Sequence, residues 1–347
     1  MPAPNIGTSK DHNLWQKEFL LNGQVEKVKR LAAIDIGTNS THLLIAAVNT
    51  KLKTFSIELA EKSNTRLGEK DLLTGALTDL AMERVLDTLE RFKDLAESHK
   101  VENVLTAATS AVREAPNGKE FLTHIKNQIG LDVEVVSGTE EARLIYLGVI
   151  SGMQFGDRPH ILIDIGGGST ELILADAYDS RALTSTKVGA VRLKRDFIKQ
   201  EPISNKRIEF LRTFIEGSLE PSVVKILRRL PEEANPLIVA TSGTAMAIGS
   251  LVASEKGDIN LKMQGYKVSK SRLNNLVEKL VKMSPEQLKK LTPLSDRRAE
   301  IIVPGALILQ TTMKMLKAEE IFLSERALRE GLVVDWMFRN GMLEDRF

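Results

Sequence analysis

The sequence contains no cysteine, and this excludes disulfide bonds, thiolate metal sites and cysteine nucleophiles. Its 5 histidines are scattered and do not show the spacing of metal ligands. It also lacks any apolar run near the roughly 20 residues that a transmembrane helix needs. Residues 1–30 do not have the basic and then apolar layout of a signal peptide. We therefore expect a cytoplasmic protein without a membrane partner.

An excess of charge of one sign is lacking as well. The chain has 48 basic and 46 acidic side chains and a net charge of +2, so the whole molecule exerts no strong field. We expect no nucleic-acid partner, and any binding of a polyanion must come from a local patch. One candidate patch is either a solvated face or a guide for a polyanion, and it consists of Lys187, Arg192, Lys194 and Arg195.

The most informative stretch is LIDIGGGSTELILA, residues 162–175. An apolar run leads into Asp164, and a second apolar run follows Glu171, which is typical of a β-hairpin with acids at its mouth. Consecutive glycines allow positive φ and let backbone N–H groups converge, so the turn can hold phosphate oxygens. The same pattern also fits a plain hairpin whose glycines serve only the turn. The residues of this loop are Gly166, Gly167, Gly168 and Ser169.

The chain repeats this pattern near its N-terminus, in AAIDIGTNSTHLLIA. When Asp35 is aligned with Asp164, seven of twelve positions are identical without a gap. Such a repeat indicates a duplicated lobe, with two phosphate loops facing one cleft. The counterpart of Glu171 in the first copy is His42, which places the metal-side acids mainly in the second copy. The first loop consists of Gly37, Thr38, Asn39 and Ser40.

The order of predicted elements is hairpin strands, helix, strand, helix and strand, and it occurs twice. This order is typical of α/β proteins with helices packed on a mixed sheet, and a chain of 347 residues fits two such units. Some local signals are more specific. They predict a capping box from Asn117 to Glu120, a strand at 131–136, a helix break or kink at Pro221, and separate helices at 296–302 and 305–316.

Three further stretches carry residues that suit phosphate chemistry. Glu140 and Glu141 open a helix, where both favour the helix dipole, but adjacent acids point in different directions and one can act as a general base. Arg113 follows a strand and a Thr-Ser turn and is either a phosphate ligand or a surface arginine. A third loop of small residues contains Ser242, Gly243 and Thr244. Its expected ligand is either another phosphate or a nucleotide.

Taken in order, the motifs resemble those of the exopolyphosphatase / guanosine pentaphosphate phosphohydrolase family, which belongs to the actin, Hsp70 and sugar-kinase superfamily. The resemblance extends over residues 31–336. The motifs are IDIGTNSTHLLIA, ATSAVREA, VSGTEEARLIYLG, IDIGGGSTELI, GAVRL, ATSGT and LREGL.

The resemblance implies an α/β fold of two ribonuclease H-like (actin-like ATPase) lobes around a central cleft, with mixed sheets and flanking helices. Residues 1–30 would be an N-terminal extension. The first lobe would contain residues 31–144 and a C-terminal helix at 326–347, and the second lobe residues 145–325. The HD-like C-terminal domain of longer members is absent, so the chain is a short member or a piece cut after the second lobe. A homodimer is one expected assembly.

The resemblance also implies an activity: Mg²⁺-dependent release of terminal orthophosphate from polyphosphate, from pppGpp, or from both. Glu141 would be the general base, and Asp164, Glu171 and Asp35 would be the metal-side acids. The two glycine loops, with Arg113, would hold the phosphates. We favour polyphosphate because the flank of the expected cleft is basic.

Other functions of the same superfamily remain open. A sugar or acetate kinase would form ADP from ATP, and a nucleotide-gated assembly protein would show ATP-dependent filaments or client binding. A non-catalytic module would bind pppGpp without cleaving it, although the presence of Glu141 argues against this option.

Overall fold

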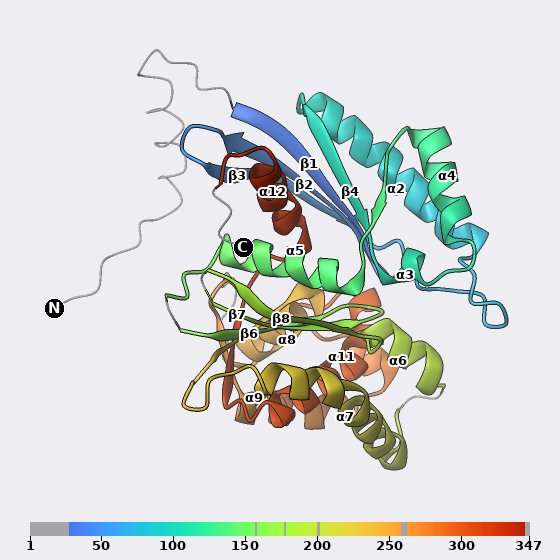
Figure 1. Cartoon of the computed structure of the whole chain (residues 1–347). Helices are drawn as coiled ribbons and strands as arrows, with labels where there is room; N and C mark the ends of the chain where they lie inside the picture. The colour runs from blue at the N-terminus through green and yellow to red at the C-terminus, as the bar shows by residue number, and fades with distance from the viewer. Residues whose placement is uncertain (1–27, 157, 177, 200–201, 258–261, 344–347) are drawn as a thin grey trace.

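A computed structural model describes residues 28–156, 158–176, 178–199, 202–257 and 262–343. Most of the expected N-terminal extension therefore lies outside the described residues. The chain forms two lobes, each built on one mixed sheet (Figure 1). The first sheet has the strand order β3-β2-β1-β4-β5, and the second has the order β10-β11-β9-β6-β7-β8.

In the first sheet, three antiparallel strands precede two strands that are parallel to β1. Apolar runs in β1 and β2 bury one face under α2, as Figure 1 shows. The strands are β1 (Val28–Ile36), β2 (Thr41–Asn49), β3 (Thr54–Ser63), β4 (Asn103–Ala108) and β5 (Glu134–Val135). The helices are α2 (Asp79–Ser98), α3 (Ser110–Arg113) and α4 (Gly118–Ile129).

The second sheet repeats the antiparallel opening, continues with β9 and β11 parallel to β6, and ends on β10, which is antiparallel to β11. Its strands are β6 (His160–Ile165), β7 (Thr170–Ala175), β8 (Ser180–Thr186), β9 (Leu237–Thr241), β10 (Lys267–Ser269) and β11 (Glu320–Leu323). Its helices are α6 (Ala190–Phe197), α7 (Asn205–Leu227), α8 (Ser242–Glu255), α9 (Lys270–Leu280), α10 (Pro285–Lys289) and α11 (Asp296–Met315). No helix in the described ranges is both long enough and apolar enough to cross a bilayer.

Two helices lie between the sheets and join the lobes. α12 (Leu328–Arg339) packs on β1 and β2, whereas α5 (Gly138–Ile150) packs on β7 and β8, and the two helices pack on each other (Figure 1). Their backbones approach closely at two glycines. A Cβ atom on Gly148 would lie 1.8 Å from the Ala327 carbonyl oxygen, and one on Gly331 would lie 1.8 Å from that of Leu144.

The repeated hairpin is confirmed in both lobes. Asp35 pairs with His42 across β1 and β2 in the same register in which Asp164 pairs with Glu171 across β6 and β7. The turns also match, because Gly37 N–H donates to the Ser40 carbonyl at 3.1 Å and its counterpart in the second lobe makes the same bond at 3.0 Å. The sequence repeat is therefore a structural repeat.

Several local expectations are wrong. None of the loop glycines has positive φ. Asn117 does not cap its helix with its side chain, which instead bonds the backbone of Leu77. The predicted strand at 131–136 is reduced to β5. Pro221 and Pro304 both lie inside continuous helices, α7 and α11.

Candidate active site

The two glycine loops meet where the lobes touch. A Cβ atom on Gly167 would lie 2.9 Å from Thr38 Cβ, and one on Gly168 would lie 2.4 Å from Ser110 Oγ. The side chains of Thr38 and Ser110 therefore leave no room for a side chain at these two positions, and a left-handed conformation is not the reason for the glycines. The sequence pattern predicted the glycine positions correctly, but positive φ, which it offered as the reason for them, is not found.

The second loop offers backbone N–H groups between the lobes. Its carbonyl groups are engaged by α6, since Ala190 N–H donates to the Gly166 carbonyl at 3.0 Å and Val191 N–H to the Gly167 carbonyl at 2.9 Å. The N–H groups of Gly167 and Gly168 have no acceptor among the described residues. Converging N–H groups of this kind suit phosphate oxygens.

The first loop has the same arrangement. The Thr38 carbonyl accepts the Gly68 N–H at 2.7 Å, so the carbonyl side of this loop is also held from behind. The N–H groups of Thr38 and Asn39 have no acceptor in the described part of the chain. Two loops from different lobes thus present unpaired donors to one region, as the repeat predicts.

Four buried carboxyl groups gather beside these loops. Burial, and next the charge of Glu141, raises the pKa of Asp35 to about 7 and that of Asp164 to about 8. Burial likewise raises the pKa of Glu141, and it raises that of Glu171 well above the ordinary value. The charge of Glu141 contributes to the raised pKa of each of the other three carboxyl groups, so the four acids lie close enough to interact.

Glu141 and Arg113 form an ion pair in this region. Arg113 Nη1 donates to Glu141 Oε2 at 3.0 Å and to the Val136 carbonyl at 2.7 Å. This pairing opposes the rise in the pKa of Glu141. Arg113 thus orients the Glu141 carboxyl group, which the family resemblance names as the general base. Its neighbour Glu140 points elsewhere and pairs with Arg143 at 2.7 Å.

Asp164 and Glu171 lie side by side on the hairpin of the second lobe. Ser185 Oγ donates to Glu171 Oε1 at 2.7 Å, and a hydrogen bond with Ser169 also reaches this carboxyl group. Both acids are almost fully buried. The serines hold the Glu171 side chain in one position without cancelling its charge.

The carboxyl groups fit a cation that takes only part of its ligands from protein. No set of three histidine, aspartate or glutamate side chains in the described ranges surrounds one point closely enough to hold a metal. However, Asp35 Oδ1 is buried without a hydrogen-bond partner, and the neighbouring acids lack compensating charge. Mg²⁺ commonly binds one or two carboxylates together with water and substrate phosphates. The carboxyl groups of this site can supply the carboxylate ligands.

The third small-residue loop forms a tight corner between β9 and α8. Ser242 has a φ of 76°, which is uncommon for a residue other than glycine, and its hydroxyl donates to the Ile165 carbonyl at 2.8 Å. Thr244 is buried against Gly305 of α11. Gly243 packs against the guanidinium group of Arg298. The corner reaches the site directly, because the Ser242 side chain also hydrogen-bonds the Asp164 carboxyl group.

A cationic group near Asp35 could not be found by sequence reasoning. We call Lys62, Arg298 and Arg329 the Arg298 cluster. Desolvation and the two arginines lower the pKa of Lys62 to about 8, while burial and the same cluster hold the pKa of His42 well below its usual value. Lys62 and Arg298 have no acidic partner among the described residues. These residues come from β3, α11 and α12, and no local motif connects them.

Three residues of the candidate basic patch, Lys187, Arg192 and Arg195, all lie near Lys70 in the fold. Arg192 donates to the Gly168 carbonyl at 2.8 Å and to Glu114 at 2.7 Å, so it lies at the second phosphate loop. Arg195 pairs with Asp196 at 2.6 Å, and Lys187 is largely exposed. At least Arg192 is therefore part of the contact between the lobes.

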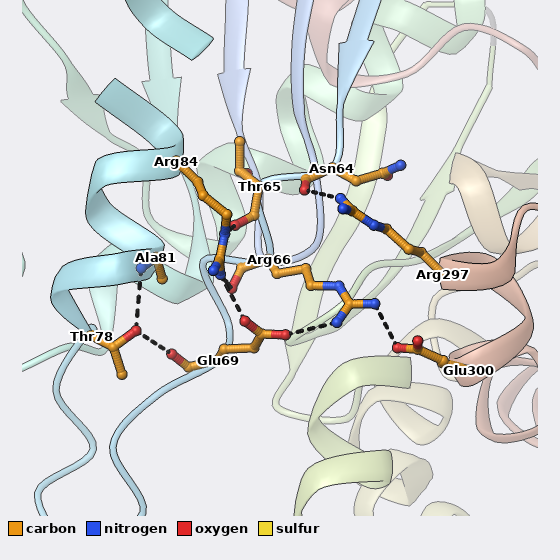
Figure 2. Close-up of polar contacts among 9 residues, drawn as sticks. All are labelled: Asn64, Thr65, Arg66, Glu69, Thr78, Ala81, Arg84, Arg297 and Glu300. Atoms are coloured by element: carbon orange, nitrogen blue, oxygen red, sulfur yellow. Dashed lines mark hydrogen bonds and ion pairs between the residues drawn. The ribbon is translucent and has the colours of Figure 1, made fainter. Parts of the chain in front are cut away.

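A polar network also joins the lobes at residues 64–69 (Figure 2). Arg66 bridges Glu69 of the first lobe and Glu300 of α11 at 3.0 and 2.8 Å, and Arg297 donates to the Asn64 carbonyl at 2.8 Å. Arg84 anchors this segment on α2 through Glu69. The segment that supports the first phosphate loop is thus tied to the helix that carries Arg298.

Comparison with known proteins relates this arrangement to a family of enzymes. The profile of the Ppx/GppA phosphatase family matches residues 44–340. Exopolyphosphatase 1 of Mycobacterium tuberculosis is 28% identical over 310 residues, which cover 88% of this chain and 87% of that protein. A guanosine-5'-triphosphate,3'-diphosphate pyrophosphatase of Aliivibrio fischeri is 28% identical over 302 residues, 87% of this chain and 58% of that protein.

A solved structure agrees with the sequence matches. The crystal structure of an exopolyphosphatase from Cytophaga hutchinsonii superposes with a TM-score of 0.83 at 27% identity, over 90% of this chain and 98% of that one. The predicted two-lobed α/β fold class is confirmed by this match and by the two sheets. The roles assigned to individual site residues stay predictions.

Proposed function

The chain belongs to the Ppx/GppA phosphatase family, and from this premise we propose that it hydrolyses the terminal phosphoryl group of inorganic polyphosphate and releases orthophosphate. The proposal rests on one observation. Loop N–H groups without an acceptor among the described residues lie together with buried acids where the two lobes meet. Such a site would bind phosphate mainly through backbone N–H groups, with Arg113 as the neighbouring cation, and would retain carboxylates for chemistry.

In the proposed reaction, the terminal phosphoryl group lies between the two loops. The N–H groups of Thr38, Asn39, Gly167 and Gly168 bind its oxygens, as in other phosphoryl-transfer sites where catalysis is mostly positioning and electrostatic stabilisation. Neutral amides also suit a repeating substrate, because each phosphate presents the same oxygens.

Glu141 would accept the proton of the attacking water. Burial raises its pKa, and a general base works best when its pKa approaches the working pH. Arg113 restricts the carboxyl group to one orientation and has further N–H donors for phosphate oxygens. The pair therefore combines a positioned base with a positive charge next to the reacting group.

The proposal includes Mg²⁺ as cofactor. Asp164 and Glu171 would hold it, with Asp35 on the opposite side of the site. When bound, the cation would neutralise charge on the phosphate oxygens. The raised pKa of Asp164 supports this assignment, since burial and the charges of Glu141 and Asp35 raise it and no cation among the described residues opposes them.

The remainder of the substrate would lie along the Arg298 cluster. These side chains are cationic and lie close to Asp35 and His42, and Lys62 and Arg298 form no ion pair with an acid among the described residues. We favour polyphosphate because such a surface suits a long anion. The alternative substrate is pppGpp, as the name of the Aliivibrio fischeri relative indicates. Cytoplasmic location and a homodimer remain predictions from the sequence.

Substitution of the base tests the mechanism. Orthophosphate release by Glu141→Gln in the presence of Mg²⁺ should fall by at least about a hundredfold, because the amide keeps the size of the side chain and removes its basicity. Removal of divalent cations with EDTA should stop release by the wild type. Glu140→Gln is the matched control, since Glu140 occupies the same helical turn and pairs with Arg143 instead. Near-normal activity of a folded Glu141→Gln variant would overturn the assignment.

Substrate choice is decided by side-by-side turnover of long polyphosphate, tripolyphosphate and pppGpp. We expect the highest kcat/KM for long polyphosphate. A clear preference for pppGpp would replace the primary proposal with its alternative, and turnover of none of the three would refute both.

A further inference from the structure

A small cavity lies between the lobes at the end of the phosphate loops away from the Arg298 cluster. Its volume is about 10 Å³, close to the space of one water molecule. Residues from both lobes form its wall, and they include both phosphate loops: Thr38, Gly68, Lys70, Ser110, Gly168 and Arg192.

The segment at residues 62–70 shows that this cavity and the Arg298 cluster lie at opposite ends of the first loop. Lys62 begins the segment beside Arg298. Asn64 then accepts a hydrogen bond from the Ser40 hydroxyl at 3.0 Å, and Gly68 N–H donates to the Thr38 carbonyl at 2.7 Å. Lys70 follows at the cavity. The segment therefore passes along the loop from one cationic group to the other.

The cavity end is also cationic. We call Lys70, Lys187, Arg192 and Arg195 the Lys70 cluster, and Glu114 and Asp196 are the acids that pair with its members. Lys70 forms no ion pair with a described residue, and its half-buried position with cationic neighbours lowers its pKa. More basic than acidic groups thus face the cavity, so an anion would be stabilised there.

The two phosphate loops themselves form one wall of the cavity. Thr38 Oγ1 lies 2.9 Å from Ser110 Oγ, and Gly168 of the other lobe closes against this pair. In the closed state the cavity admits no ion as large as orthophosphate. A small separation of Gly168 from Ser110 would connect it with the site, because these residues belong to different lobes.

We propose that the inter-lobe cavity at Lys70 and Arg192 is an exit site for orthophosphate, the product of the proposed function on which this inference rests. The orthophosphate anion formed beside Glu141 and Asp164 is attracted by the Lys70 cluster. The shortened polyanion stays on the Arg298 cluster, at the other end of the loops. Product and remaining substrate thus leave the site in different directions.

Product inhibition by inorganic phosphate tests the exit site, with tripolyphosphate as substrate. Lys70→Ala should raise the inhibition constant for phosphate about tenfold, the loss expected for one charged hydrogen bond, and leave KM for tripolyphosphate unchanged. Arg195→Gln, on the other wall, should act in the same direction. Lys62→Ala should instead raise KM. Lys289→Ala, which removes an exposed positive charge on α10, should change neither constant.

An unchanged phosphate inhibition constant in both cavity variants would overturn the exit site, and so would an equal rise of KM and of the inhibition constant. Failure of the proposed function is recognised separately, because the wild type would then release no phosphate from any phosphoanhydride. In that case calorimetric titration with inorganic phosphate still compares the wild type with Lys70→Ala, and equal affinities would reject the site.

Discussion

The role of an acidic side chain in this protein depends more on its neighbours than on its residue type. Glu140 and Glu141 are adjacent in the sequence, yet one is paired on the surface with Arg143 and the other is buried beside Arg113. The difference arises because successive helical residues point about 100° apart, so that only one can face the other lobe. Burial then raises the pKa of Glu141, which is the property a general base needs.

A buried histidine gives a second prediction at this scale. His160 is fully buried and stacks on Phe155 with ring centroids 3.9 Å apart, and Nε2 has no hydrogen-bond partner in the described part of the chain. Burial lowers its pKa from 6.5 to about 4. The neutral form is therefore favoured by folding, and its stabilising contribution is complete above pH 6.5 and is lost as the pH falls towards 4.

The loss should reach about 3 kcal/mol at pH 4 for this group alone. His160→Phe keeps an aromatic ring in the stack and removes the titration. The difference in urea midpoint between variant and wild type should therefore favour the variant increasingly as the pH falls from 7 to 4. A constant difference across this range would contradict the assignment.

At the scale of elements, the crossing of α5 and α12 depends on two glycines. A Cβ atom at Gly331 would lie 1.8 Å from the Leu144 carbonyl oxygen, which is backbone and cannot move aside alone. The pair of helices separates the two sheets, so any displacement there changes how the lobes meet. The LREGL motif thus carries a packing requirement in addition to its place in the family pattern.

Gly331→Ala should lower the free energy of unfolding by about 3 kcal/mol, because a packed interface resists an inserted methyl group. Gly217→Ala is the matched control: this exposed glycine of α7 has open space around it, so the change should stabilise the helix by about 1 kcal/mol. Urea unfolding of both variants provides the measurement. Equal midpoints for the two variants would show that α5 and α12 can separate freely.

At the scale of the whole molecule, the bridge of Arg66 and Glu300 ties the lobes together beside the site (Figure 2). Both side chains are partly exposed, so the pair contributes at most about 1 kcal/mol. If substrate binds only when the lobes are closed, weakening the closed state raises the apparent dissociation constant by the same free energy. Loss of the bridge should therefore affect the apparent affinity for substrate more than the stability of the fold.

Arg66→Ala and Glu300→Ala should each raise KM by up to about fivefold, and the double variant should show no further increase. Arg91→Ala removes an ion pair with Glu61 that lies within the first lobe, so it should leave KM unchanged. Additive effects of the two bridge variants would indicate that the residues act independently and do not close the lobes as a pair.

The sequence by itself determined the features that depend on local patterns. Alternating and continuous apolar runs predicted the hairpin strands, and the internal repeat predicted two related lobes with a loop in each. These features depend on neighbours along the chain, where periodicity and turn chemistry act directly.

Only the tertiary structure decided how the parts meet. It placed Arg113 against Glu141, brought Lys62 to Arg298 across 236 positions, and showed that Gly168 is required by Ser110 of the other lobe. It also let α11 continue through Pro304, where packing overrides the local helix-breaking tendency. The reason is that burial, charge neighbours and close backbone approach depend on residues distant in sequence, and no local motif records them.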